Sequence, residues 1–171
     1  MKQLFKIDLK DYNENYGRFK RPSVRAVIIS DKKLAMVYSK KYDYYKFPGG
    51  GIEYNEDHIT ALKREVLEET GLTILDSSVK ELGSVLRIQK SSFAERTIFE
   101  QQNFYYLCDV DDTLDLQSLD DYESDEGFTL KFVSASDAVM TNKSHSHGDY
   151  DLILIERETR VIEYLVENNY L

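Results

Sequence analysis

The chain is poor in cysteine and proline. Its 171 residues include one cysteine, Cys108, which excludes an intrachain disulfide. Because Cys108 lies in the apolar stretch 104–110, we expect a buried, inert thiol in a protein of the reducing cytoplasm. The two prolines, Pro22 and Pro48, lie in the first third of the chain, and no linker rich in Pro, Gly or Ser follows them. We therefore expect a single domain over residues 1–171.

Long apolar segments are also absent. No run approaches the roughly 20 residues that a membrane-spanning helix needs. Residues 1–8 carry charges and lack the apolar core of a signal peptide. We therefore expect neither membrane association nor secretion.

The excess of negative charge is confined to one segment. The chain has 31 acidic and 22 basic side chains, a net charge of −9. Nine of the acids lie in residues 109–126, which contain no Lys or Arg, and we expect a solvated loop there. Residues 1–46 are basic instead, with 12 basic against 5 acidic side chains. The total charge argues against broad nucleic-acid binding, while the basic quarter suits a small polyanion.

Hydrophobic periodicity predicts a mixture of strands and helices. Alternating or β-branched apolar residues indicate strands, and apolar residues three or four apart indicate helices. The expected strands are 24–30, 34–39, 82–88, 98–110 and 128–133, and the expected helices are about 57–70 and 150–167. This order predicts an α/β fold in which helices cover a mixed sheet.

The segment with the clearest chemical signal is a glycine run followed by an acidic helix. Residues 49–51 are three glycines, which permit close approach of a ligand to the backbone, and Gly71 suits the left-handed end of the helix. Glu65, Glu68 and Glu69 form a solvent-facing stripe that repels itself by a few tenths of a kcal/mol per pair. A divalent cation would offset this repulsion, because Mg²⁺ binds carboxylates and substrate phosphates. The alternative is an ordinary turn before a solvated helix face.

The spacing of this segment resembles the Nudix (MutT-like) box. The resemblance covers 23 of the 171 residues, from 50 to 72, and leaves no position of the pattern unmatched. The matching residues are Gly50, Glu56, Arg64, Glu65, Val66, Glu68, Glu69, Gly71 and Leu72. The resemblance implies the family's αβα sandwich, a mixed sheet flanked by the box helix and a C-terminal helix.

The resemblance also implies an activity. Members of this family are Mg²⁺- or Mn²⁺-dependent pyrophosphohydrolases that cleave a nucleoside diphosphate linked to another moiety. No proline follows the box, and the first tyrosine after it is Tyr105, so substrates such as ADP-ribose and diadenosine polyphosphates are disfavoured. A nucleoside triphosphate is then the favoured small-molecule partner. The alternative is a noncatalytic nucleotide-sensing module on the same fold, and a homodimer is left open.

Roles within the box carry over residue by residue. Glu68 and Glu69 are expected to bind the metal, with Glu65 as a further ligand or as the base that deprotonates the attacking water. The backbone carbonyl of Gly49 is expected to complete the metal ligands. Arg64 and Glu56 are expected to pair and to hold the loop against the helix, with Gly71 as the structural end of that helix.

Other candidate residues lie in or outside the box. Arg25 and Lys46 are expected to contact phosphate oxygens, together with Gly50 and Glu53 of the loop, although both cations could be exposed strand residues. Glu126 is a candidate for a second catalytic acid beside Glu65 and Arg64, or else a plain surface acid. Two histidines, His145 and His147, either approach the phosphates or belong to a polar loop.

Overall fold

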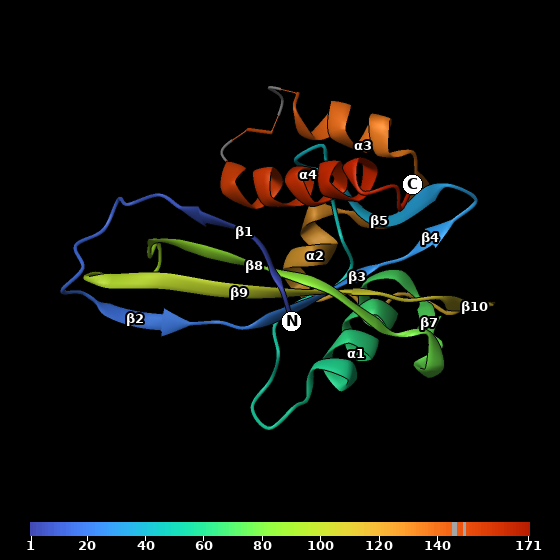
Figure 1. Ribbon diagram of the computed structural model, residues 1–171, viewed down its shortest axis with the longest axis horizontal. Helices are drawn as coiled ribbons and strands as arrows, with labels where there is room; N and C mark the ends of the chain where they lie inside the picture. Colours follow the sequence, from blue (N-terminus) through green and yellow to red (C-terminus); the bar gives the residue numbers. More distant parts are fainter. Residues whose placement is uncertain (145–146, 149) are drawn as a thin grey trace.

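The computed structural model describes residues 1–144, 147–148 and 150–171, without the side chain of Asp112. Its largest element is a five-stranded mixed sheet in which β8 and β9 are antiparallel and the other strands pair in parallel (Figure 1). The strand order is β1-β8-β9-β2, with β3 also pairing with β9. These strands are β1 (Gln3–Asp8), β8 (Lys80–Lys90), β9 (Thr97–Leu107), β2 (Gly17–Lys20) and β3 (Ser23–Val27).

The remaining strands form two smaller sheets. One joins β11 (Phe128–Val133), β5 (Lys33–Ser39), β4 (Ile29–Ser30) and β6 (Tyr44–Lys46), and the other joins β10 (Val110–Leu114) to β7 (Leu72–Ile74). The helices are α1 (His58–Thr70), α2 (Asp121–Glu126), α3 (Ala135–Asn142) and α4 (Leu152–Glu167), with a 3₁₀ turn η1 (Asp76–Ser78). None of the helices in the described residues is long and apolar enough to cross a membrane.

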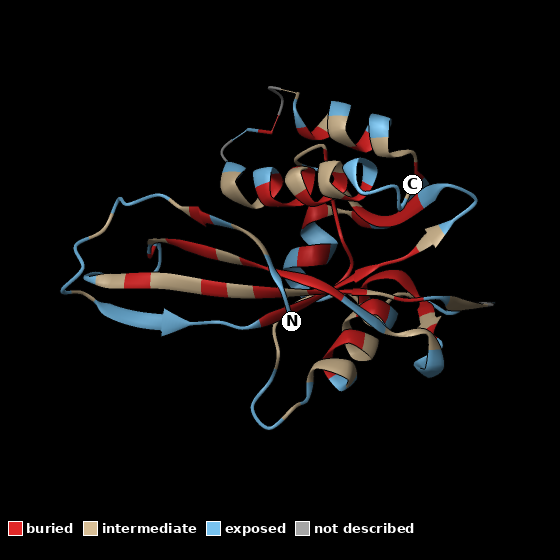
Figure 2. Ribbon diagram, in the orientation of Figure 1, coloured by how far each residue is buried: buried red, intermediate tan, exposed pale blue. Residues whose placement is uncertain are grey.

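Two hydrophobic cores lie on opposite sides of the sheets. Alternation along β9 places Tyr106 in the core with Leu62 and Val66 of α1, and Tyr105 in the core with Val161 of α4. Figure 1 accordingly shows α1 on one side of the strands and α3 and α4 on the other, and Figure 2 shows burial concentrated on the surfaces between them. The expected fold, a mixed sheet flanked by the helix of residues 58–70 and a C-terminal helix, is confirmed.

The acidic segment 109–126 is not the solvated loop that its composition predicts. It contains β10 and α2, and Glu123 and Glu126 of α2 are buried. Helix α2 forms because Asp120 and Glu123 make a reciprocal capping box and Gly127 ends the helix in the left-handed region, with φ 67°. Several elements were not expected from the sequence, namely β1, β2, β6, β7 and α3.

A buried ion pair attaches α4 to the sheet. Arg157 and Glu158, both fully buried, bond to each other, and Arg157 Nη1 donates to Gln101 Oε1 at 2.9 Å and Asn103 Oδ1 at 2.8 Å. Glu158 Oε2 accepts from the backbone N–H of Phe47 at 3.0 Å. Since Phe47 directly precedes residues 48–51, α4 helps to fix the start of the glycine loop.

Candidate active site

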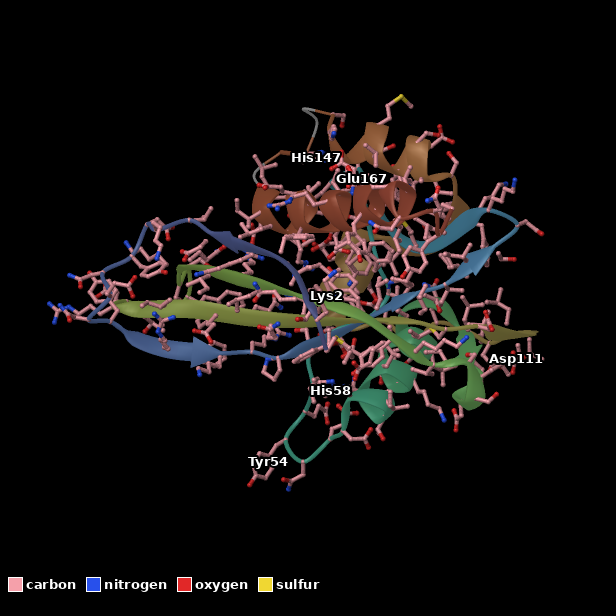
Figure 3. The ribbon with its side chains drawn as sticks, in the orientation of Figure 1. Lys2, Tyr54, His58, Asp111, His147 and Glu167 are labelled. Atoms are coloured by element: carbon pink, nitrogen blue, oxygen red, sulfur yellow. The ribbon has the colours of Figure 1, made fainter. Side chains whose placement is uncertain are left out.

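The glycine loop is bound to β3 and leads into α1. The backbone N–H groups of Val24 and Ala26 donate to the carbonyls of Gly50 at 3.0 Å and Pro48 at 2.8 Å. Gly49 has φ 132°, and a Cβ there would lie 2.2 Å from the carbonyl oxygen of Val24, so no other residue fits. The tip of the loop is exposed, and Figure 3 shows Tyr54 projecting from it next to the start of α1.

Arg64 joins the loop to α1. Its Nε and Nη2 donate to the two oxygens of Glu56 at 2.9 Å each, and Nη2 also donates to the carbonyl of Gly51 at 3.1 Å. The expected pair between Arg64 and Glu56 is therefore present. These hydrogen bonds hold the pKa of Glu56 below its ordinary value.

Glu65 and Glu68 face an acidic cavity beside the loop. Arg64 Nη1 donates to Glu65 Oε1 at 2.9 Å and to Glu68 Oε2 at 3.2 Å, so one cation bridges the two carboxylates. Burial raises the pKa of Glu68, and the neighbouring Glu65 contributes to the same shift while Arg64 opposes it. The cavity measures about 300 Å³, and its charged lining residues are Arg21, Glu53, Arg64, Glu65, Glu68, Asp120 and Glu123.

Glu69 departs from the expected solvent-facing stripe. It is only 1% exposed, forms an ion pair with Lys46, and accepts from the backbone N–H of Gly49 at 2.9 Å. Burial raises its pKa to about 7, against the opposing effects of Lys46, Arg25 and the Gly49 amide. The expectation was wrong because β6 and the glycine loop cover this side of α1.

The acidic cavity has the donor chemistry of a hard divalent cation. In the described residues no three His, Cys, Asp or Glu side chains are spaced to hold a metal ion. Arg64 already joins Glu65 and Glu68, and Lys46 occupies Glu69. Glu65 and Glu68 lie close enough for one guanidinium nitrogen to reach both, and their oxygens are the donor type that Mg²⁺ and Mn²⁺ prefer.

A basic cavity adjoins the acidic one across the glycine loop. It measures about 400 Å³ and is lined by Arg21, Arg25, Lys46 and Arg87 together with residues 49–51. Arg21, Gly50, Gly51 and Tyr122 line both cavities. Arg25 is 6% exposed, and its Nε and Nη1 lack a hydrogen-bond partner in the described part of the chain. A buried guanidinium with unused donors is suited to accept an anionic ligand.

Comparison with models of protein families identifies the family of this chain. The family model of the NUDIX domain matches residues 19–153 of the chain. The chain belongs to the NUDIX domain family. The Nudix match includes every residue that lines the acidic cavity and all but Leu154 of those that line the basic cavity. The expectation of one domain over residues 1–171 stays a prediction.

Individual Nudix proteins resemble the chain over different lengths. The 8-oxo-dGTP diphosphatase of Buchnera aphidicola subsp. Acyrthosiphon pisum (strain APS) is 41% identical over 49 residues, which are 28% of this chain and 40% of that protein. The chain therefore matches less than half the length of this curated relative. Two solved structures share the fold at 21% identity and 84% coverage of this chain. They are a NUDIX hydrolase from Nitrosomonas europaea (TM-score 0.56, 90% of that chain covered) and the E. coli ORF135 protein (TM-score 0.52, 91% covered).

Of the candidate residues outside the Nudix box, some line a cavity and others do not. Arg25 and Lys46 both line the basic cavity, so they are buried and not exposed strand residues. His147 is buried on the α4 side (Figure 3), where its ring nitrogens contact the carbonyls of Tyr42 at 2.9 Å and Asn142 at 3.0 Å. It lines neither the acidic nor the basic cavity. His145 lies outside the described residues.

Glu123, and not Glu126, lies at the acidic cavity. Glu126 lines neither cavity and accepts from Ser39 Oγ at 3.2 Å and from Tyr44 Oη at 3.3 Å. Glu123 lines the acidic cavity and accepts from Tyr122 Oη at 2.9 Å. Sequence reasoning missed Glu123 because it treated the acidic segment as a loop. The Asp-x-x-Glu spacing at its end is a helix-start signal that could have found it.

Proposed function

We propose that the chain is a divalent-metal-dependent pyrophosphohydrolase that cleaves a nucleoside diphosphate linked to another moiety, with a nucleoside triphosphate favoured. The observation that carries the proposal is the adjacency of two cavities across one glycine loop, one lined by Glu65 and Glu68 and the other by Arg25 and Lys46. Membership of the Nudix family and the likeness to the 8-oxo-dGTP diphosphatase of Buchnera support it.

Glu65 and Glu68 would hold Mg²⁺ or Mn²⁺, and Glu69 and the Gly49 carbonyl stay predicted additional ligands. When bound there, the metal would neutralise charge on the diphosphate oxygens and acidify an attacking water. Arg64 would keep the two carboxylates oriented through its bonds to the loop and to Glu56. It would act by positioning these groups, without contacting the reacting atoms.

A carboxylate of the acidic cavity would accept the proton of the water. Glu65 is one candidate, and Glu123 replaces Glu126 as the second, because Glu123 lines the cavity. Arg25 and Lys46 would bind phosphate oxygens beside Gly50, with Glu53 at the acidic side of the loop. General base catalysis requires a base within hydrogen-bond reach of the water. Glu65 and Glu123 line the acidic cavity and are better candidates for this role than Glu126, which lines neither cavity.

Partner and location follow from the same chemistry. The substrate would be a small nucleotide, with no membrane and no broad nucleic-acid partner. A cytoplasmic location agrees with the single buried thiol of Cys108. The homodimer stays a prediction that size-exclusion chromatography measures.

The test is phosphate release from a panel of nucleotides with Mg²⁺ or Mn²⁺. We expect Glu68→Gln to lower turnover by about 100-fold, because loss of metal-site groups has effects of this order. The matched control is Glu167→Gln, an exposed glutamate on α4, far from the start of α1 in Figure 3. If the wild type is inert with both metals, the noncatalytic nucleotide-sensing module replaces this proposal.

A further inference from the structure

Part of the α4-facing side of the large sheet is polar, where a helix-covered face is ordinarily apolar. On β9, Gln101 and Asn103 are buried on the side of α4, and Gln101 lies opposite Arg87 of β8 in the register. Buried polar groups of this kind need partners. Arg157 of α4 bonds to both amides, whereas Arg87 and Gln101 line the basic cavity.

Arg87 is held in one orientation at that cavity. Its Nε donates to Gln89 Oε1 at 2.8 Å, its Nη2 pairs with Asp151, and it is 3% exposed. Asp151 is also the N-cap of α4 and accepts from Ile153 N at 3.1 Å. The third nitrogen, Nη1, makes no hydrogen bond within the described residues and is left to donate to a ligand. A guanidinium fixed at two nitrogens loses little freedom on binding, and it offers donors only.

Arg87 and the proposed phosphate-binding residue Arg25 reach the cavity from different strands and different register positions. Arg25 is opposite Tyr105 and Arg87 is opposite Gln101, on the two sides of β9. Four residues along the strand and two strand spacings separate their backbones by about 16 Å. A ligand that lies along β9 between these two positions presents different groups to Arg25 and to Arg87.

The surroundings of Arg87 favour a neutral planar group. Asp151 balances its charge, whereas Arg25 keeps unpartnered donors at the other end. The Arg87 guanidinium lies 5.7 Å from the Phe99 ring centroid, and Phe93, which is 62% exposed, lies edge-on to Phe99 at 5.8 Å. Both rings line the cavity. Aromatic walls with a fixed edge donor are suited to a heterocyclic base.

We propose that Arg87 reads the nucleobase of the substrate and selects bases with an oxo group at purine C6 or pyrimidine C4. Its Nη1 donates to that oxygen. An amino group at the same position is itself a hydrogen-bond donor and cannot accept from Nη1. The inference rests on the proposed function for the identity of the ligand as a nucleotide. It adds the class of base and the residue that distinguishes it.

The test compares nucleotides that differ mainly at this one group. Dissociation constants are measured by calorimetry for ITP against ATP and for UTP against CTP, with EDTA present so that no metal-dependent turnover occurs. We expect the wild type to bind the oxo member of each pair about tenfold tighter or more, the discrimination of one good base contact. Arg87→Gln, whose amide both donates and accepts, should bind the members of each pair equally. Arg18→Gln, on the exposed strand β2, should keep the wild-type preference.

Thermal unfolding checks that each variant is folded, and the wild-type comparison requires no variant. Equal binding of the oxo and amino members by the wild type, or no binding of either, overturns the inference. Retention of the preference in folded Arg87→Gln also overturns it. Failure of the proposed function is distinct, because it appears as absent hydrolysis with Mg²⁺ and Mn²⁺, whereas this comparison measures binding without metal.

Discussion

Replacing Gly71 by alanine tests whether the end of α1 depends on backbone contact as well as on conformation. Gly71 caps α1 with φ 73°, and Gly127 caps α2 with φ 67°. A Cβ at Gly71 would lie 2.1 Å from the carbonyl oxygen of Asp115, whereas one at Gly127 would lie 3.1 Å from Lys40 Cβ, a contact that a much smaller shift relieves. The two substitutions therefore share the conformational penalty and differ in the clash.

The expected magnitudes follow from these contacts. The left-handed conformation costs an alanine about 1–2 kcal/mol, partly offset by about 0.4–1 kcal/mol from the stiffer unfolded chain. At Gly71 the backbone of Asp115 must also move. This movement disturbs the hydrogen bond that the Asp115 N–H donates to the Gly71 carbonyl at 2.8 Å. Such overpacking adds about 1–3 kcal/mol. We expect Gly127→Ala to lose about 1 kcal/mol and Gly71→Ala about 3 kcal/mol.

Urea denaturation and thermal unfolding measure both variants against the wild type. A difference of about 2 kcal/mol corresponds to about 4–8 °C in Tm for a chain of this size. Equal losses in the two variants would refute the argument that the contact with the Asp115 backbone adds to the loss at Gly71. An unchanged Gly71→Ala would refute the conformational argument as well.

Further outcomes are expected from groups described above. Cys108 should resist a thiol reagent at pH 8 in the native protein and react after denaturation, because burial raises its pKa to about 12; labelling of the native protein would contradict this. Burial also raises the pKa of Tyr150 to about 12 from 10.0, so the folded state keeps a proton that the unfolded state loses. The free energy of unfolding should then fall between pH 10 and 12 in urea titrations, and a flat profile would count against the burial. Arg64→Lys should lose about 1 kcal/mol or more, since lysine cannot bond both Glu56 oxygens, while Arg96→Lys at an exposed position before β9 should lose less. EDTA should abolish hydrolysis and excess Mg²⁺ should restore it, and hydrolysis that persists in EDTA would contradict the metal requirement.

The helix of the Nudix box could be predicted because its signals are local. Asp57 accepts from the N–H groups of Ile59 and Thr60, and Gly71 ends the helix four residues after the Leu67 carbonyl it binds. Such caps depend on neighbours in sequence, so the chain alone contains them. Strands β3, β5, β8, β9 and β11 were predicted from residue type in the same way.

The parts of the site that sequence reasoning missed depend on long-range contacts. Glu69 is buried because Lys46, 23 residues earlier, covers it. The orientation of Arg87 at the cavity depends on Asp151, 64 residues later, which pairs with it. Charge composition predicted that Glu69 and the acidic segment 109–126 are exposed to solvent. A charge pattern does not say which opposite charge folds against it, and this is why Glu123 was also overlooked.

The buried Glu158 has a consequence for recombination between relatives. One of its oxygens holds Arg157 and the other holds the amide of Phe47, so the last helix and the start of the glycine loop are geometrically matched parts. A chimera that takes its C-terminal third from another Nudix protein would inherit a loop fitted to a different helix. Grafts that transfer both segments together should therefore retain more hydrolysis than grafts that divide them.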